Sequence, residues 1–319
     1  MTSRGAEKRS EITIGVDISK DSLDAYRFPD GDSRRFANST AGYRSFLKWI
    51  GPEVARVVFE PTGPYHGAFE QALSRRGLPL VKVNPRQARC FAEATGKLAK
   101  TDPLDAALLA RMGMLLQLEA RPAPTEAISD LRQLHLARMG LIKDRTAAQT
   151  RAKVLSIPLL KQQNSKRLEQ IKRQLAAIDA EILRRIRADD EMARRYDILV
   201  SIPGVARLTA FSLLIEMPEL GTLEPAQAAS LAGLAPIARQ SGRWNGHAFI
   251  RGGRGNVRRA LYMPALVAIR FNPDLKAKYD AFIAAGKPAK LAIAAIMRKI
   301  VLLANALLKA GWNWTPKAA

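Results

Sequence analysis

The chain has 319 residues, of which 47% are hydrophobic, so about two domains with ordinary hydrophobic cores are expected. Its only cysteine, Cys90, excludes an intramolecular disulfide and a cysteine-based zinc site, and suits a reducing cytoplasm. The N-terminus lacks an apolar signal segment, and basic residues interrupt the apolar stretch Leu291–Ala310, so we expect a cytoplasmic protein with no membrane partner.

The formal net charge of +22 is concentrated in the later part of the chain. Residues 1–119 contain 18 Lys and Arg against 14 Asp and Glu, a surplus of 4, whereas residues 120–319 contain 33 against 15, a surplus of 18. Such an asymmetry favours a polyanionic partner, most often nucleic acid, over a surface that is merely solvated.

The first third of the chain predicts an α/β domain over residues 1–119. Runs with strand character are Ile12–Asp17, Leu23–Phe28, Arg34–Ala37, Val54–Glu60 and Leu80–Val83, and helical patterns follow each of the last three. Three successive strands predict a meander, and the later strand–helix alternation predicts parallel crossovers. This mixed order is the ribonuclease H or RuvC-like layout.

Four acids fall where this layout would bring them together. Asp17 ends the first strand, Glu60 ends the fourth, and Asp102 and Asp105 lie one turn apart at the start of an apolar helix. Carboxylates that converge need a cation, and magnesium is the natural one because it prefers oxygen ligands. Two such ions about 4 Å apart can clamp a phosphate. In the structural alternative, Asp102 and Asp105 cap the helix, Asp17 closes a turn and Glu60 is solvated.

Residues 120–198 predict two long helices, because the stretch from Thr125 to Tyr196 contains a single proline, Pro158. The second helix has a coiled-coil seam with 3-4-3-4 spacing, formed by Leu168, Ile171, Leu175, Ile178 and Ile182. A break near residues 156–158 would reverse the chain into an antiparallel pair. Residues 143–187 hold twelve Lys and Arg against four Asp and Glu, so we predict a dimerising coiled coil that touches nucleic acid; a passive spacer is the alternative.

Residues 199–319 predict a mainly α-helical C-terminal domain. Residues 198–216 resemble a helix-hairpin-helix element, in which the turn at Ile202–Val205, with Gly204, presents backbone N–H groups to a phosphate. A plain helix-turn-helix belonging to the core is the rival interpretation.

An arginine-rich segment follows, with no acid between Glu224 and Asp274. Its arginines are Arg239, Arg243, Arg251, Arg254, Arg258, Arg259 and Arg270. The planar guanidinium of arginine can donate two hydrogen bonds to one phosphate, so we predict that the first six contact nucleic acid. Ser241 lies among them, followed by Gly242, and is either a nucleophile toward a phosphodiester or an ordinary turn residue.

Seven short motifs, in order along nearly the whole chain, carry a resemblance to a known family. They are Gly15–Lys20, Phe59–His66, Lys100–Asp105, Ile202–Val205, Gly233–Pro236, Ser241–Gly242 and Gly255–Arg258. With these motifs the chain resembles the DEDD transposases of insertion sequence family 110, which include Piv-type invertases and bridge-RNA-guided recombinases.

The resemblance implies a RuvC-like domain in which Asp17, Glu60, Asp102 and Asp105 bind magnesium, and a C-terminal transposase domain in which Ser241 forms a phosphoserine link to the cut strand. It further implies recombination of donor and target DNA through a noncoding bridge RNA. The enzyme would be a nucleoid-associated homodimer or homotetramer, with the serine of one subunit meeting the metal site of another. The alternatives are a junction-resolving nuclease with an idle Ser241, and a nucleic-acid-binding protein without activity.

Overall fold

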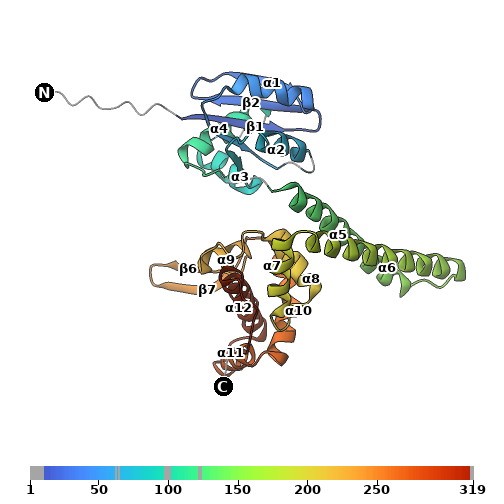
Figure 1. Ribbon diagram of the computed structural model, residues 1–319. Coiled ribbons are helices and arrows are strands. Elements are labelled where there is room, and N and C mark those ends of the chain that lie inside the picture. The colour runs from blue at the N-terminus through green and yellow to red at the C-terminus, as the bar shows by residue number, and fades with distance from the viewer. Residues whose placement is uncertain (1–10, 62, 64, 97–101, 121–123, 317–319) are drawn as a thin grey trace. The chain divides into compact units, whose positions relative to one another are not determined.

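The computed structural model describes residues 11–61, 63, 65–96, 102–120 and 124–316, without the side chains of Asp102 and Pro103 (Figure 1). The chain divides into two compact units, residues 1–124 and residues 125–319. The predicted helical region therefore belongs to the same compact unit as the predicted C-terminal domain.

The first unit contains a five-stranded mixed sheet. Its strands are β1 (Ile12–Ile18), β2 (Ser22–Phe28), β3 (Ser33–Ala37), β4 (Val54–Phe59) and β5 (Leu80–Lys82), in the spatial order β3-β2-β1-β4-β5. The first three strands pair antiparallel, while β4 is parallel to both β1 and β5. The predicted meander and the predicted parallel crossovers are both present.

Both faces of this sheet carry hydrophobic clusters, because successive strand residues point to opposite faces. The helices of the unit are α1 (Thr40–Ile50), α2 (His66–Ser74), α3 (Pro85–Ala94) and α4 (Asp102–Leu115). Phe59 of β4 packs with residues of α1 and α2 in one cluster, and its neighbour Val58 packs with residues of α3 and α4 in the other. The central strands β1 and β4 are thereby buried from both sides.

Helix α4 lies directly against β1 because two glycines permit it. A Cβ atom on Gly15 would lie 2.0 Å from the carbonyl oxygen of Ala106 and 2.5 Å from the backbone nitrogen of Ala110. At the other end of the contact, a Cβ atom on Gly113 would lie 2.5 Å from the side chain of Val58 and 3.1 Å from that of Thr13. The helix therefore runs antiparallel to β1.

We expect Gly15→Ala to destabilise the first unit by about 1–3 kcal/mol or more, because the new methyl group would meet helix backbone that cannot rotate away. Urea unfolding followed by circular dichroism measures the effect. Gly67→Ala in α2 is the matched control, since its Cβ would have nothing within 4 Å and should be neutral or stabilise the unit by up to about 1 kcal/mol. Equal unfolding curves for the two variants would contradict the close α4–β1 contact.

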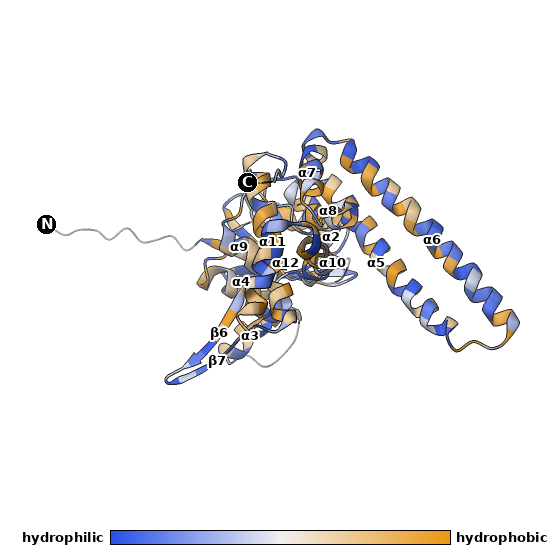
Figure 2. Cartoon of the chain, turned by 90° about the horizontal axis from the view of Figure 1, so that it is seen from below, coloured by the Kyte–Doolittle hydropathy of each residue, from blue (hydrophilic) through white to orange (hydrophobic). Residues whose placement is uncertain are grey.

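The second unit begins with two long antiparallel helices, α5 (Glu126–Ala152) and α6 (Pro158–Arg187), which lie side by side in both views (Figures 1 and 2). The predicted chain reversal at residues 156–158 is confirmed. On α6 the buried residues are Ile171, Leu175, Asp179, Ile182 and Ile186, so most of the predicted seam faces α5 or the body of the unit. A polar contact inside the seam was not predicted: the guanidinium of Arg138 donates to Asp179 at 2.5 Å.

The remaining helices form the body of the second unit. They are α7 (Asp190–Ser201), α8 (Arg207–Glu216), α9 (Pro225–Leu231), α10 (Gly255–Phe271), α11 (Pro273–Ala284) and α12 (Ala289–Ala310). Helix α12 is long and apolar enough to cross a membrane by length and composition. Its residues Ile296, Ile300 and Ala304 are fully buried in the hydrophobic core, however, so it packs as a core helix of the second unit.

A β-hairpin, β6 (Pro236–Ser241) and β7 (Trp244–Ile250), interrupts the helices and was not predicted. All six residues of β6 are exposed, as are five of the seven in β7. The hairpin stands out from the helical body and its tip is hydrophilic (Figures 1 and 2).

Candidate active site

Asp17 and Glu60 occupy the same edge of the sheet. Strands β1 and β4 run parallel, and their last paired residues are Val16 and Phe59. Asp17 and Glu60 are the next residues of their chains, and both are partly buried. Because neighbouring parallel strands end at a common edge, the register brings these two acids close together, as the sequence predicted.

Helix α4 brings its first turn to this edge. Asp17 lies two residues beyond Gly15 on the same face of β1, which is about 6.6 Å further along the strand. About 6.6 Å corresponds to four to five residues of an α-helix. Since Gly15 contacts α4 around residues 106–110 and the helix runs antiparallel, Asp17 lies level with the turn that contains Asp102 and Asp105.

The side chains that the structure describes do not form a complete metal site. Among the side chains that the structure describes, no group of three or more His, Cys, Asp or Glu could hold a metal ion. The side chain of Asp102 lies outside that part, as do Lys100 and Thr101 of the same motif. The four-acid metal site therefore stays a prediction, supported by the register of β1, β4 and α4.

Asp24 is an acid of this region that the sequence did not single out. It lies directly opposite Asp17 in the β1–β2 ladder and is only 8% exposed. Arg35, its partner in the β2–β3 ladder, donates to both carboxylate oxygens at 2.8 and 3.0 Å. The charge of Asp24 is thus compensated within the sheet, which separates it chemically from the predicted metal ligands.

Ser241 sits beside the two-residue turn of the hairpin. It pairs with Trp244, and Gly242 and Arg243 form the turn. Gly242 has φ +56°, the left-handed conformation that a hairpin turn with glycine at its first central position requires. The Ser241–Gly242 pair therefore belongs to a turn, which is one of the two interpretations of the sequence. The turn also leaves Ser241 exposed at the tip of the hairpin.

The predicted nucleic-acid arginines divide into two groups. Arg239, Arg243 and Arg251 are exposed on or beside the hairpin, and the guanidinium of Arg239 lies 5.0 Å from the ring centroid of Phe249. Arg259 is exposed near the start of α10, where its guanidinium donates to the side-chain oxygen of Asn256 at 2.5 Å. The other two, Arg254 and Arg258, are partly buried, and their guanidiniums bond to other segments of the protein.

Gly204 has a packing role that the sequence did not predict. It lies between α7 and α8 with φ +95°, and a Cβ atom there would lie 2.7 Å from the carbonyl oxygen of Pro264 and 3.1 Å from the backbone nitrogen of Ala268. Close packing against α10 thus explains this glycine. The arrangement favours the rival interpretation, a turn between two core helices.

Comparisons with known proteins agree with this architecture. The family model for DEDD transposases of IS110 matches residues 14–157, and the model described as "Transposase IS116/IS110/IS902 family" matches residues 196–280. The chain is 28% identical to the pilin gene-inverting proteins of Moraxella bovis and Moraxella lacunata, over 94% of its own length and 96% of theirs. The chain belongs to the IS110 family of transposases.

A shorter match links the chain to an insertion element. An uncharacterized 43.6 kDa protein of insertion element IS110 from Streptomyces coelicolor is 34% identical over 117 residues, which is 36% of this chain and 29% of that protein. As a member of the IS110 family the chain is a DNA recombinase of the transposase class.

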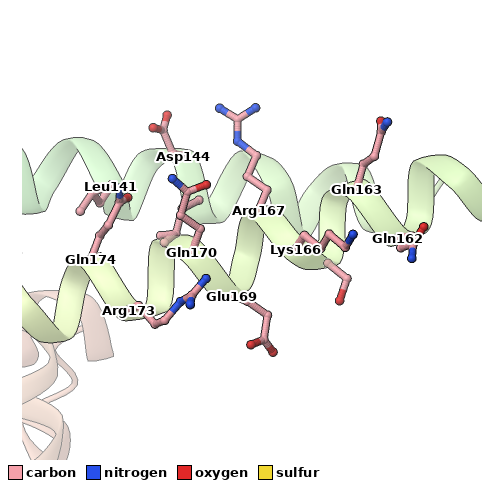
Figure 3. Close-up of a pocket in the computed structure, with 12 residues that line it drawn as sticks. Leu141, Asp144, Gln162, Gln163, Lys166, Arg167, Glu169, Gln170, Arg173 and Gln174 are labelled. Carbon is pink, nitrogen blue, oxygen red and sulfur yellow. The ribbon is translucent and has the colours of Figure 1, made fainter.

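This IS110 transposase also carries a polar groove on the α5–α6 pair (Figure 3). Its cationic side chains are Lys166, Arg167 and Arg173, all on α6, and two acids, Glu169 of α6 and Asp144 of α5, also line it. Glutamines 162, 163, 170 and 174 line it beside them. Long cationic and amide side chains suit contacts with a nucleic-acid backbone, so the groove supports the predicted basic surface of this pair.

Proposed function

We propose that this transposase cuts and rejoins donor and target DNA with Ser241 as its nucleophile. The observation that carries the proposal is the place of Ser241, at the tip of an exposed hairpin between Arg239 and Arg243. A hydroxyl so exposed can reach a DNA strand, and the two guanidiniums can offset charge that grows on the phosphate oxygens. The test is whether a covalent protein–DNA adduct forms at this serine.

In the proposed step, the Ser241 oxygen bonds to a backbone phosphorus while the bond from that phosphorus to one sugar oxygen breaks. The hydroxyl proton leaves the serine, and the departing sugar oxygen takes up a proton. The product is a phosphoserine ester, which keeps one phosphodiester bond for the later rejoining step, so no ATP is required.

We further propose that the first unit is a RuvC-like domain and that Asp17, Glu60, Asp102 and Asp105 hold a divalent metal, magnesium. Oxygen donors alone suit this ion, and the strand order β3-β2-β1-β4-β5 supports the domain type. Bound magnesium supplies positive charge toward phosphate oxygens. The chain contributes the edge at which β1, β4 and the first turn of α4 meet.

The partners implied by the resemblance are donor and target DNA, a noncoding bridge RNA, and further copies of this chain. The polar groove on α5–α6, with three cations and two acids, supports a nucleic-acid contact there, and the long antiparallel pair supports a coiled coil that forms a homodimer or homotetramer. We infer that such an assembly works at the bacterial nucleoid.

Affinity for DNA or RNA should fall steeply as salt rises, because each phosphate contact releases counterions. Measured as a binding constant between about 50 and 200 mM salt, a protein with 6–10 phosphate contacts loses about 10³–10⁵-fold. A nearly flat dependence would remove the nucleic-acid partner from the proposal.

A junction-resolving nuclease is the second candidate. The same acids would serve it, with water as the nucleophile and Ser241 uninvolved. The exposed serine between two arginines favours the recombinase, since a nuclease needs no hydroxyl at that position.

A further inference from the structure

The two ends of the hairpin meet at a pair of glycines. A Cβ atom on Gly253 would lie 2.2 Å from the backbone nitrogen of Gly233, and one on Gly233 would lie 2.3 Å from the carbonyl oxygen of Gly252. Next to this crossing, the backbone N–H of Arg254 donates to the carbonyl of Leu231 at 2.7 Å. The segments that enter and leave the hairpin are therefore in direct backbone contact.

One guanidinium ties both segments together. A terminal nitrogen of Arg258 donates to the carbonyl of Gly233 at 3.1 Å and to the carbonyl of Gly252 at 2.9 Å. These two carbonyls belong to opposite ends of the hairpin. Arg258 itself is part of α10, so it fastens both ends to the helical body.

A second guanidinium fastens the outgoing segment to the region after α8. Arg254 donates to both carboxylate oxygens of Glu219, at 2.7 and 2.6 Å, and to the carbonyl of Glu216. Burial is the largest single influence and acts to raise the pKa of Glu219. The hydrogen bond from Arg254, a backbone hydrogen bond and the charges of Arg254 and Arg132 together hold that pKa below its ordinary value. Beside this pair, the amide of Asn256 donates to the carboxylate of Glu216 at 2.9 Å.

The hairpin needs such fastening because it has little else to hold it. A two-stranded hairpin is marginally stable by itself, and the exposed residues of β6 and β7 provide almost no packing on either face. Its direction relative to the helical body is therefore set where it joins that body.

We infer that Arg254 and Arg258 are positioning residues, which fix the direction in which the hairpin presents Ser241, and that they are not phosphate contacts. This inference rests on the proposed function of Ser241. It revises the sequence-based prediction for these two arginines, because both terminal nitrogens of Arg254 and one terminal nitrogen of Arg258 donate to carboxylate or carbonyl oxygens of the protein.

The test compares Arg254→Gln with Arg251→Gln, an exposed arginine three residues away. Two quantities are measured: the salt dependence of DNA affinity and the rate of covalent adduct formation at saturating DNA. We expect Arg254→Gln to leave the salt slope unchanged and to lower the rate by about tenfold or more. Loss of a phosphate contact in Arg251→Gln should reduce the slope by about one. A slope reduced by about one in Arg254→Gln, with an unchanged rate at saturation, would overturn the inference.

A double variant with exchanged charges distinguishes loss of hairpin positioning from simple misfolding. The double variant Arg254→Glu with Glu219→Arg restores the ion pair in reverse, and should recover the adduct rate to within about threefold of wild type. A folded double variant that stays as slow as Arg254→Gln would count against the inference. If wild type forms no adduct, the proposed function fails, and hydrogen exchange of the amides in residues 237–250 then tests the inference by itself. Exchange about tenfold faster in Arg254→Gln supports a positioning role for Arg254, and unchanged exchange overturns it.

Discussion

Ser241→Ala should eliminate both the covalent protein–DNA adduct and the recombinant product, while the protein still binds nucleic acid. The expected result follows from removal of the attacking oxygen at an exposed position, where the lost hydroxyl disturbs no packing. The measurement mixes protein, RNA, magnesium and labelled DNA, denatures the sample, and looks for label that migrates with the protein.

Gln240→Ala is the matched control, since it removes an equally exposed polar side chain from the preceding position of β6. It should retain the adduct within a few-fold of wild type. Joined strands from the Ser241→Ala protein, or only free nicked ends from wild type, would rule out the serine mechanism and leave the nuclease in its place.

Replacing Asp17, Glu60 or Asp105 by the corresponding amide should lower strand cleavage by about 100-fold or more, because each change removes a negative ligand that several kcal/mol of transition-state stabilisation depend on. The fold should persist, since these acids are not part of the hydrophobic clusters. Cleavage of labelled DNA across a magnesium titration, with thermal unfolding in parallel, measures both effects. Asp30→Asn, at an exposed acid of the same unit, should leave cleavage unchanged.

Asp102→Asn separates the two explanations for that residue. Asparagine caps a helix about as well as aspartate, so a capping role predicts nearly unchanged stability and activity. A metal ligand predicts unchanged stability with cleavage lost by about 100-fold or more. Full activity in this variant would show that Asp102 caps the helix and is not a metal ligand.

The architecture of the first unit could be predicted because its sequence signals are local and regular. The central strands β1 and β4 have buried residues on both faces, so their hydrophobic pattern is strong, and the order of strands and helices leaves few topologies. The approach of α4 to β1 was harder to foresee. It depends on Gly15 meeting the α4 backbone at Ala106 and Ala110 and on Gly113 meeting Val58, which lie far apart in the chain, and neither glycine alone indicates its partner.

The hairpin escaped prediction for the opposite reason. A strand is recognised by alternation between a buried and an exposed face, and β6 has no buried face at all. Its sequence therefore reads as an arginine-rich loop around Ser241. The only local signal was Ser241–Gly242, which was interpreted as turn chemistry without the two strands that the turn connects.

A count of arginines does not show which of them are available to nucleic acid. Arg254 lies in a segment without nearby acids in the sequence, yet its partner Glu219 comes from 35 residues earlier in the chain. Arg258 bonds to backbone carbonyls, which no count of charges reveals. Formal charge indicates the class of partner, but only the fold shows which cations remain available to it.

The exposed hairpin has a consequence for how such an enzyme can change over generations. Within the part of the chain that the structure describes, residues 236–250 lie outside the hydrophobic clusters. Substitutions there should cost little folding stability, whereas most substitutions in the hydrophobic core lower it. These side chains can therefore diverge rapidly under selection. Gly233 and Gly253 at its base have no such freedom. We therefore expect lineages to vary the hairpin residues other than Ser241, Arg239 and Arg243, while the glycine crossing stays fixed.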